Sequence, residues 1–319
     1  MLLGFDIGGT KCAAILGEKT NDETINIVDK VVLPTNKPAY EMIESLFITA
    51  ENMLNKNGST KADINGIGIS CGGPLNSKTG IILSPPNLPG WDNIPIVDMA
   101  EKRFGIKALL QNDANACAMA EWKFGAGKGY SNIIFLTFGT GMGAGMILNG
   151  KLYSGTTDMA GEVGHIRLAD KGPVCFGKEG SFEGFCSGGG IAQLAKTIAK
   201  EKLEAGTKLS FCNNINDLHL ITARTVADDA YQGDQTAIDI YKTSARHLGK
   251  GISLLIDILN PEVIIIGSIY ARAQPLIEPY MREAIEQEAL PSAYNSCKIV
   301  PAALAENIGD IAALVLADN

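Results

Sequence analysis

Apolar runs broken by glycine turns open the chain and recur near its middle. Residues 2–16 read LLGFDIGGTKCAAIL, and residues 133–148 read IIFLTFGTGMGAGMIL. Each stretch has an apolar run, a glycine-rich turn and a second apolar run, which predicts a strand, a turn and a returning strand. Two units of the same kind, far apart in the sequence, indicate two related half-domains that face each other across a cleft.

The rest of the chain alternates between apolar runs of strand length and segments with apolar residues at helical spacing. We predict further strands at 25–33, 65–71, 107–111, 263–267 and 299–302. We predict helices at 38–55, 95–104, 116–124, 191–200, 222–231, 234–259, 272–288 and 303–317, the last interrupted by Gly309. A polar turn is expected at 17–23, and irregular connections at 84–91 and 203–220. This alternation predicts an α/β protein.

Both glycine turns contain the residue types that bind phosphate. Glycines let backbone N–H groups approach a ligand closely, and a threonine adds a hydroxyl. The first turn offers Asp6, Gly8, Gly9, Thr10 and Lys11, and the second offers Gly139, Thr140, Gly141 and Gly143. One such turn alone is equally well explained as a plain hairpin, but the second copy favours a nucleotide held from both sides.

A polar pair follows the predicted strand at 107–111. Asn112 and Asp113 stand directly before an alanine-rich helix, so either residue is a candidate helix N-cap, and for an isolated pair that interpretation is the favoured one. Ligands of open α/β sheets, however, bind at the carboxyl ends of strands, where an aspartate is available as a general base. Both interpretations stay open.

Two other segments are candidate ligand contacts. The stiff loop SPPNLPGW at 84–91 carries Asn87, which is either directed toward a cleft or part of an ordered surface connection. The apolar strand VIIIG ends at Gly267 before a helix, an arrangement that suits an adenine or ribose but also occurs in units that bind nothing.

Composition narrows the class of partner. The 319 residues are 46% hydrophobic and have a formal net charge of −8, which argues against nucleic acid or an anionic membrane surface as the main partner. Seven scattered cysteines are typical of reduced, buried thiols and not of a disulfide framework. Because a strand begins next to Met1 and no apolar run approaches membrane-span length, we expect a cytoplasmic protein that works on small molecules.

With these motifs in hand, the chain resembles the ROK family of sugar kinases and sugar-responsive repressors, within the actin-like ATPase superfamily that includes hexokinase. The resemblance covers nearly the whole chain and is carried in order by FDIGGTK, GIGISCGGP, SPPNLPGW, QNDANACAMAE, TFGTGMGAGMILNGKLY, AGEVGHI, SFEGFCSGGGIA and NPEVIIIGS. It implies two actin-like (ribonuclease H-like) lobes, each with a mixed sheet flanked by helices, separated by a cleft. The smaller lobe would hold residues 1–112 and 303–319, and the larger lobe residues 113–302.

The resemblance also implies roles for single residues. Asp6, Gly8, Gly9, Thr10 and Lys11 would form the first phosphate motif, with Asp6 near a magnesium ion through water. Gly139, Thr140, Gly141 and Gly143 would form the second motif, and Gly267 the adenosine motif. Asp113 would be the catalytic base and also contact the sugar, together with Asn87, Asn112, Glu162, His165 and Glu183. His165, Glu162 and Glu183 would each be ordinary structural or surface residues if they stood alone.

The chain departs from the family in its zinc motif. The family usually binds zinc with the histidine of the EVGHI-type segment and three cysteines, whereas this chain reads GPVCFGKEGSFE. Phe176 and Ser181 stand where the second and third cysteines are expected. Only His165 and Cys175 remain, with Cys186 as a remote substitute, and a structural zinc site needs four nitrogen or sulfur ligands. We therefore expect no zinc, and we expect Phe176 to pack beneath His165 while one ring nitrogen of His165 donates to a backbone carbonyl.

Taken together, the resemblance implies an ATP- and magnesium-dependent kinase that phosphorylates a hydroxyl of a hexose or N-acetylhexosamine, of the glucokinase or N-acetylmannosamine kinase kind, and that forms a homodimer. The alternative is a catalytically weak sugar-binding sensor or regulator of the same family. Family repressors have a helix-turn-helix domain before the first phosphate motif, and here that motif starts at residue 2. With both phosphate motifs and Asp113 present, we favour the kinase.

Overall fold

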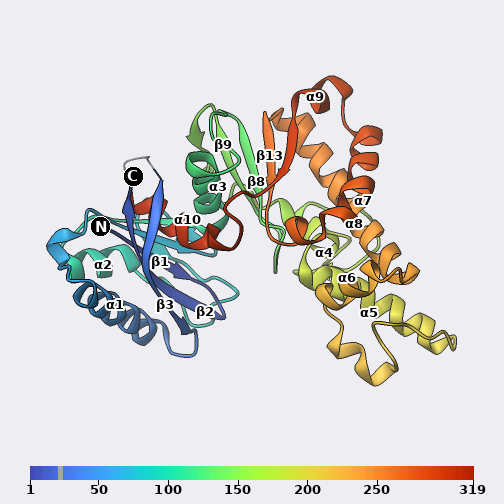
Figure 1. Cartoon of the computed structure of the whole chain (residues 1–319), viewed down its shortest axis with the longest axis horizontal. Helices are drawn as coiled ribbons and strands as arrows, with labels where there is room; N and C mark the ends of the chain where they lie inside the picture. Colours follow the sequence, from blue (N-terminus) through green and yellow to red (C-terminus); the bar gives the residue numbers. More distant parts are fainter. Residues whose placement is uncertain (21–23) are drawn as a thin grey trace. The chain divides into compact units, whose positions relative to one another are not determined.

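The computed structural model describes residues 1–20 and 24–319. By the density of its contacts the chain divides into two compact units (Figure 1). The first comprises Met1–Ser131, Gly145–Gly161 and Ala303–Asn319, and the second comprises Asn132–Ala144 and Glu162–Ala302. The first unit includes residues 1–112 and 303–319, which we expect in the smaller lobe, and also residues 113–131 and 145–161, which we expect in the larger lobe. The lobe boundary after residue 112 stays a prediction.

A five-stranded mixed sheet forms the centre of the first unit, in the order β3-β2-β1-β4-β7. Its strands are β1 Leu2–Ile7, β2 Lys11–Lys19, β3 Ile25–Pro34, β4 Gly66–Cys71 and β7 Ala108–Asn112. β1, β2 and β3 form the predicted antiparallel meander, and β4 and β7 continue the sheet in parallel from β1. The helices are α1 Ala39–Lys56, α2 Ile96–Phe104, α3 Asp113–Phe124 and α10 Ile308–Ala317.

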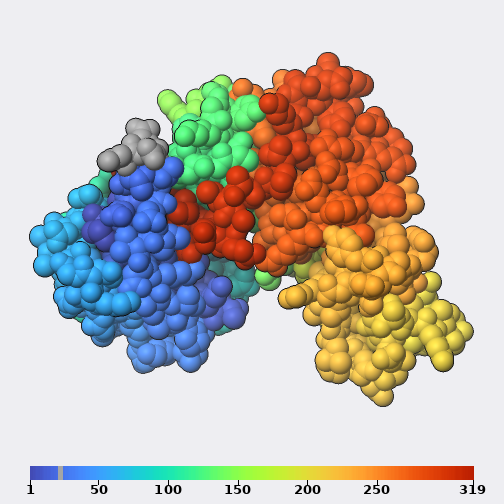
Figure 2. All heavy atoms as spheres, viewed as in Figure 1, coloured from blue at the N-terminus to red at the C-terminus, as the bar shows by residue number. Residues whose placement is uncertain are grey.

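Alternate residues of β1 face the two sides of this sheet, as the period of a strand requires. Leu3 and Phe5 pack with α1 and α2 in the larger core, whereas Leu2 packs with Ala313 and Leu314 of α10. The helices α1 and α2 therefore cover one face, and α10 covers part of the other. In Figure 2 the dark red atoms of the C-terminal segment lie directly against the blue atoms of the N-terminal strands.

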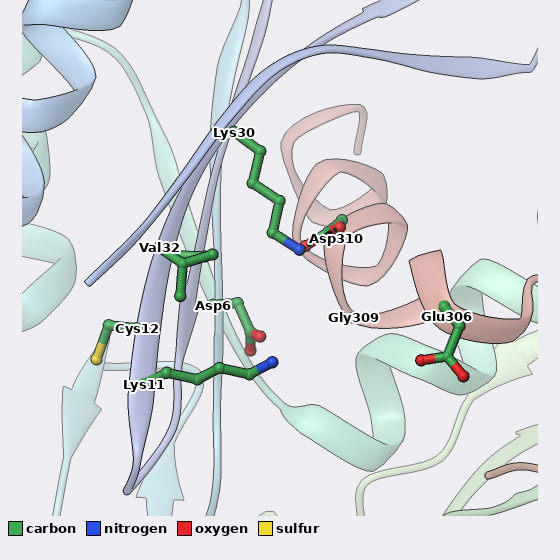
Figure 3. A pocket seen from close by; sticks show the side chains of 9 residues that line it. Asp6, Lys11, Cys12, Lys30, Val32, Glu306, Gly309 and Asp310 are labelled. Carbon is green, nitrogen blue, oxygen red and sulfur yellow. Dashed lines mark hydrogen bonds and ion pairs between the residues drawn. The ribbon is translucent and has the colours of Figure 1, made fainter. Parts of the chain in front are cut away.

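Glycines allow α10 to lie unusually close to the sheet. A Cβ added to Gly68 would stand 2.0 Å from the Ala313 carbonyl oxygen, and one added to Gly66 would stand 2.1 Å from that of Ala317. Two ion pairs fasten the same helix: Lys30 to Asp310 at 2.6 Å and Lys19 to Asp318 at 3.1 Å. Figure 3 shows Lys30 extending from β3 to Asp310.

The second sheet has the order β10-β9-β8-β13-β14. Its strands are β8 Ile133–Leu136, β9 Ala144–Leu148, β10 Lys151–Leu152, β13 Val263–Ile266 and β14 Lys298–Pro301. The helices of the second unit are α4 Phe182–Phe185, α5 Gly188–Glu204, α6 Ala223–Tyr231, α7 Gln235–Leu259, α8 Ile269–Glu288 and α9 Pro291–Ser296. Short hairpins are formed by β5 Leu75–Asn76 with β6 Ile81–Ile82, and by β11 Val174–Cys175 with β12 Lys178–Glu179. In the part of the chain that the structure describes, no helix is both long and apolar enough to cross a bilayer.

The predicted strands are confirmed, whereas several predicted helix boundaries are wrong. The terminal helix begins at Ile308 and not at 303, because the N–H groups of Ala303 and Leu304 donate to the buried Glu121 carboxylate at 3.2 and 2.9 Å. Gly309 therefore lies in the first turn of α10 and does not interrupt a helix.

Other differences lie at segment ends. α5 and α8 start three residues earlier than predicted, and α9 has no counterpart in the prediction. The predicted turn at 17–23 is wrong at its start because β2 continues to Lys19, and its residues 21–23 lie outside the described residues.

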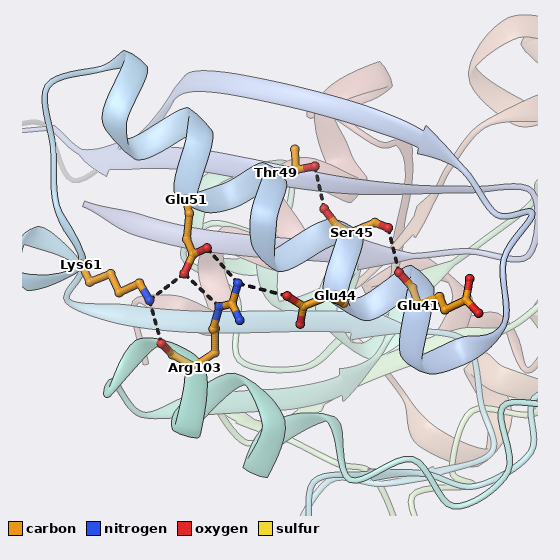
Figure 4. Close-up of polar contacts among 7 residues, drawn as sticks. All are labelled: Glu41, Glu44, Ser45, Thr49, Glu51, Lys61 and Arg103. Atoms are coloured by element: carbon orange, nitrogen blue, oxygen red, sulfur yellow. Dashed lines mark hydrogen bonds and ion pairs between the residues drawn. The ribbon is translucent and has the colours of Figure 1, made fainter.

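A cluster of charged side chains ties α2 to α1 (Figure 4). The Arg103 guanidinium contacts both carboxylate oxygens of Glu51 at 2.9 Å, and Lys61 reaches the same carboxylate at 2.6 Å. Bidentate geometry makes such a pair stronger than an ordinary surface ion pair. The bond from Arg103 is the main reason that the pKa of Glu51 lies below its ordinary value.

We expect Arg103→Ala to lower the free energy of unfolding by about 1 kcal/mol in low salt, and by less in high salt. Because the pKa of Glu51 is lowered in the folded state, the stabilisation by the Arg103–Glu51 pair is present at neutral pH. It is lost as the pH falls through the pKa of Glu51 in the folded protein. Urea denaturation at several pH values measures it. Lys102→Ala is the control, since its pair with Asp98 on the same helix is solvent-exposed. Equal effects of the two substitutions would contradict the prediction.

Candidate active site

The first glycine turn joins β1 to β2 and contacts the loop that carries Asn87. Gly8 closes the turn by donating its N–H to the Lys11 carbonyl oxygen at 3.1 Å. A Cβ added to Gly9 would stand 2.2 Å from the Asn87 carbonyl oxygen. Thr10 and Lys11 are exposed. The structure therefore brings the first predicted phosphate motif together with one predicted sugar residue, within one unit.

Asp6 occupies the base of this turn, beside a cavity of about 140 Å³. The cavity is lined by Asp6, Lys11, Cys12, Ala13, Lys30, Val32, Glu306, Gly309 and Asp310, and Figure 3 shows these residues. Burial, followed by the carboxylates of Asp113 and Asp310, raises the pKa of Asp6 to about 7, while Lys30 and Lys11 lower it. Burial of the Asp6 carboxylate therefore outweighs the opposing effect of the two lysines.

Asn112 and Asp113 stand at the junction of β7 and α3, where the sequence places them. The Asn112 side-chain oxygen accepts from the N–H groups of Ala114 and Asn115 at 3.0 and 3.4 Å, so Asn112 is the helix N-cap. Its amide nitrogen lies near Gly73, where an added Cβ would be 3.4 Å from it. The N–H₂ group of an asparagine can donate hydrogen bonds while its oxygen accepts. The cap also explains why α3 starts at Asp113 and not at 116 as predicted.

The Asp113 carboxylate uses one oxygen locally, accepting from the Ala114 N–H at 2.8 Å. Solvent reaches this side chain, yet the protein atoms around it desolvate the carboxylate and raise its pKa above the ordinary value, while the backbone bonds oppose that shift. A carboxylate with a raised pKa and a second oxygen available suits a general base.

The second glycine turn joins β8 to β9 and borders a pocket of about 460 Å³. The pocket is lined by Gly139, Thr140, Gly188, Gly189, Ala192, Ile221, Thr222, Ala223, Arg224, Ser268, Ile269 and Arg272. The N-terminal ends of α5, α6 and α8 all contribute to this lining. Helix N-termini attract anions, because their N–H groups have no partner within the helix.

Of the predicted nucleotide residues, Gly139 and Thr140 line this pocket directly. Gly267 is next in the sequence to the lining residue Ser268. Gly141 and Gly143 belong to the turn but do not line the pocket, and their backbone groups bond within it: the Gly143 N–H donates to the Thr137 hydroxyl at 2.9 Å, and the Gly141 carbonyl oxygen accepts from the Gly139 N–H at 3.1 Å. The sequence interpretation missed Gly188, Gly189, Arg224 and Arg272 as lining residues. The three glycines at 188–190, directly before a predicted helix, were the signal for the first two.

The remaining predicted sugar residues lie in the second unit, on short segments around this turn. His165 ends a 3₁₀ turn, Val163–His165, which follows Glu162. Both side chains are exposed. Glu183 lies in α4, and its carboxylate accepts from the Met142 N–H at 2.8 Å and from the Cys175 thiol at 2.6 Å.

The segment that departs from the family's zinc motif is held by other contacts. The Phe176 and His165 rings pack with their centroids 5.0 Å apart, which confirms the predicted packing. Ser181 is buried and caps α4 by accepting from the Gly184 N–H at 3.1 Å. The His165 backbone carbonyl oxygen accepts from Lys178 Nζ at 2.7 Å, and the predicted bond from the His165 ring to a backbone carbonyl stays a prediction. Phenyl and hydroxyl groups do not fit a closed zinc site.

We expect purified protein to contain no stoichiometric zinc and to keep its activity after treatment with a strong chelator followed by magnesium. The reason is that His165 and Cys175 alone cannot give the affinity of a four-ligand site. Elemental analysis, with activity measured before and after chelation, tests this. One zinc per chain whose removal abolishes activity would show the prediction to be wrong.

The sequence and the fold both match known proteins. The profile of the ROK family matches residues 2–319. A glucokinase from Halalkalibacterium halodurans is 32% identical over 314 residues, which are 97% of this chain and 92% of that protein. A ROK family glucokinase from Streptomyces griseus, solved in complex with glucose and AMPPNP, is 30% identical, with a TM-score of 0.78 and 99% of both chains covered.

A regulator also resembles the chain: a xylose repressor from Caldicellulosiruptor bescii is 29% identical over 93% of this chain and 73% of its own length. The predicted fold class, α/β with two actin-like lobes built on mixed sheets, is confirmed by the structural match. This chain belongs to the ROK family.

Proposed function

We propose that this protein is an ATP-dependent kinase that phosphorylates a hydroxyl of a hexose or N-acetylhexosamine. The observation that carries the proposal is the position of Asp113 at the carboxyl end of β7, in the same unit as the first glycine turn and electrostatically coupled to Asp6. Similarity to glucokinases at 31–33% identity supports the same activity.

The pocket beside the second glycine turn is the proposed ATP site. Its helix N-termini and the Thr140 hydroxyl suit phosphate oxygens, and Ser268 and Ile269, which follow Gly267, suit the nucleoside. Arg224 and Arg272 add positive charge to the lining. The complex of the Streptomyces griseus glucokinase with AMPPNP supports ATP as the phosphoryl donor.

In the proposed mechanism, Asp113 accepts the proton of the attacking sugar hydroxyl while the hydroxyl oxygen bonds to the γ-phosphorus and the bond to ADP breaks. Asn112 offers its amide N–H₂ to a sugar hydroxyl, since its oxygen already caps α3. Asn87, Glu162, His165 and Glu183 are the other proposed sugar contacts.

Magnesium is the metal that ATP use implies, and among the described residues no group of three or more His, Cys, Asp or Glu side chains is placed to hold it directly. The raised pKa of Asp6, caused by burial and by the neighbouring carboxylates of Asp113 and Asp310, marks a group that gains from a nearby cation. We propose that Asp6 holds the ion through water. When bound, magnesium neutralises charge on the phosphate oxygens.

A coupled ATPase assay over glucose, mannose, fructose, allose, N-acetylglucosamine and N-acetylmannosamine tests the proposal. We expect sugar-dependent turnover with at least one of them. Sugar binding in calorimetry without any turnover would instead favour the sensor or regulator, which the resemblance to xylose repressors keeps as the second candidate. On the resemblance alone we also propose a cytoplasmic homodimer, which sedimentation and fractionation would test.

A further inference from the structure

Both oxygens of the Glu183 carboxylate are engaged. One accepts from the Met142 N–H at 2.8 Å and the other from the Cys175 thiol at 2.6 Å. Met142 belongs to the second glycine turn, two residues after Thr140, which lines the proposed ATP pocket. The carboxylate therefore joins the phosphate turn to the β11–β12 hairpin.

The carboxylate also has little freedom to move. A Cβ added to Gly141 would stand 2.9 Å from the Glu183 oxygen that bonds Met142, and one added to Gly164 would stand 3.2 Å from the same oxygen. A Cβ on Gly164 would also stand 2.3 Å from the Met142 carbonyl oxygen. The oxygen is thus enclosed between the phosphate turn and the segment that carries His165.

The backbone of α4, which carries Glu183, is fixed from the other side by α7. The Phe182 ring packs on Gly251, where a Cβ would stand 2.3 Å from it. Phe185 stacks on His247 with ring centroids 3.5 Å apart, and the Ser244 hydroxyl donates to the Phe185 carbonyl oxygen at 2.8 Å. The backbone that carries Glu183 is therefore held by contacts of both neighbouring aromatic residues with α7.

Cys175 is the donor to the other oxygen of the Glu183 carboxylate, with its thiol 2.6 Å from that oxygen. A protonated thiol donates to the carboxylate, whereas a thiolate would repel it.

We propose that Glu183 is a positioning residue for the phosphate donor: its carboxylate holds the Met142 N–H and thereby the second glycine turn in the form that binds phosphate, and Cys175 orients the carboxylate. This inference rests on the proposed kinase function and extends it, because one side chain would serve the donor in addition to its proposed sugar contact.

The experiment measures the dissociation constant of AMPPNP with magnesium and without sugar, by calorimetry, for six forms of the full chain: the wild type, four variants and one control variant. We expect Glu183→Ala to weaken binding on the order of tenfold, because the Met142 N–H loses its acceptor. Glu183→Gln should stay within about threefold of wild type, since its amide oxygen still accepts from Met142. Cys175→Ala should weaken binding about threefold, and Cys175→Ser, which keeps a donor, should not.

Glu179→Ala is the matched control, because Glu179 lies on the same hairpin but pairs with the exposed Lys171. AMPPNP affinity of Glu183→Ala equal to that of wild type would overturn the inference, and so would a Gln variant as weak as the Ala variant. Failure of the wild-type protein to bind AMPPNP would instead overturn the proposed function. Circular dichroism of each variant separates loss of affinity from loss of folding.

Discussion

Replacing Asp113 by asparagine is expected to abolish sugar phosphorylation, lowering kcat by about 10²- to 10⁴-fold, while sugar binding stays within about tenfold. The amide keeps the size of the carboxylate and one acceptor oxygen, which can still receive the Ala114 N–H. It cannot accept a proton from the attacking hydroxyl. Calorimetry with the sugar and a coupled kinase assay measure the two halves of this expectation.

The pH dependence of the wild-type protein gives a second check on Asp113. Because desolvation raises its pKa, the group becomes protonated at a higher pH than an ordinary aspartate, and only the ionised form acts as a base. We therefore expect kcat to fall on the acid side at a pH above the usual aspartate range. Asp98→Asn, an exposed change on α2, is the control. Substantial turnover by Asp113→Asn would remove Asp113 from the role of base.

Replacing Gly68 by valine is expected to lower the free energy of unfolding by about 3 kcal/mol or more. The new Cβ would lie 2.0 Å from a backbone oxygen of α10, and backbone cannot rotate away as a flexible side chain does. The helix must therefore leave the sheet, which exposes Leu2, Ala13 and Ile15 on that face. For a domain of ordinary stability this is a large fraction of the total.

Urea denaturation measures the loss, and Gly72→Ala on the segment after the same strand is the control. A Cβ on Gly72 meets no atom within 4 Å, so we expect a change within about 0.5 kcal/mol. A Gly68→Val protein as stable as the control would mean that α10 does not need its close contact with β4.

The fold was predictable from the sequence where local pattern decides the structure. Apolar runs between glycine turns predicted both sheets, because a buried strand needs apolar residues on its faces. The wrong helix boundaries occur where residues far apart in the sequence determine the local structure. Nothing near residue 303 indicates that Glu121, far earlier in the chain, accepts the first N–H groups of the predicted terminal helix.

The candidate site divides in the same way. Glycine spacing and the polar pair at the end of a strand identified both turns and Asp113, since these features are contiguous in the sequence. The pocket lining from α6, including Arg224, and the bond from Met142 to Glu183 depend on tertiary packing, so no local pattern announces them. Asn112 caps α3, as one of the two interpretations of the polar pair predicted, and its contact with a sugar hydroxyl stays a prediction.

The close seating of α10 on the first sheet also sets an order of events during synthesis. The strands β1, β2 and β4 leave the ribosome early, but the helix that covers their second face is made only after the whole of the second unit. At translation rates of about 5 to 20 residues per second, the α10 side of this sheet stays exposed for many seconds before α10 is synthesised. The nascent chain must therefore carry an apolar sheet face, with glycines in place of side chains, until α10 emerges, and this interval is when a chaperone would matter most to this protein.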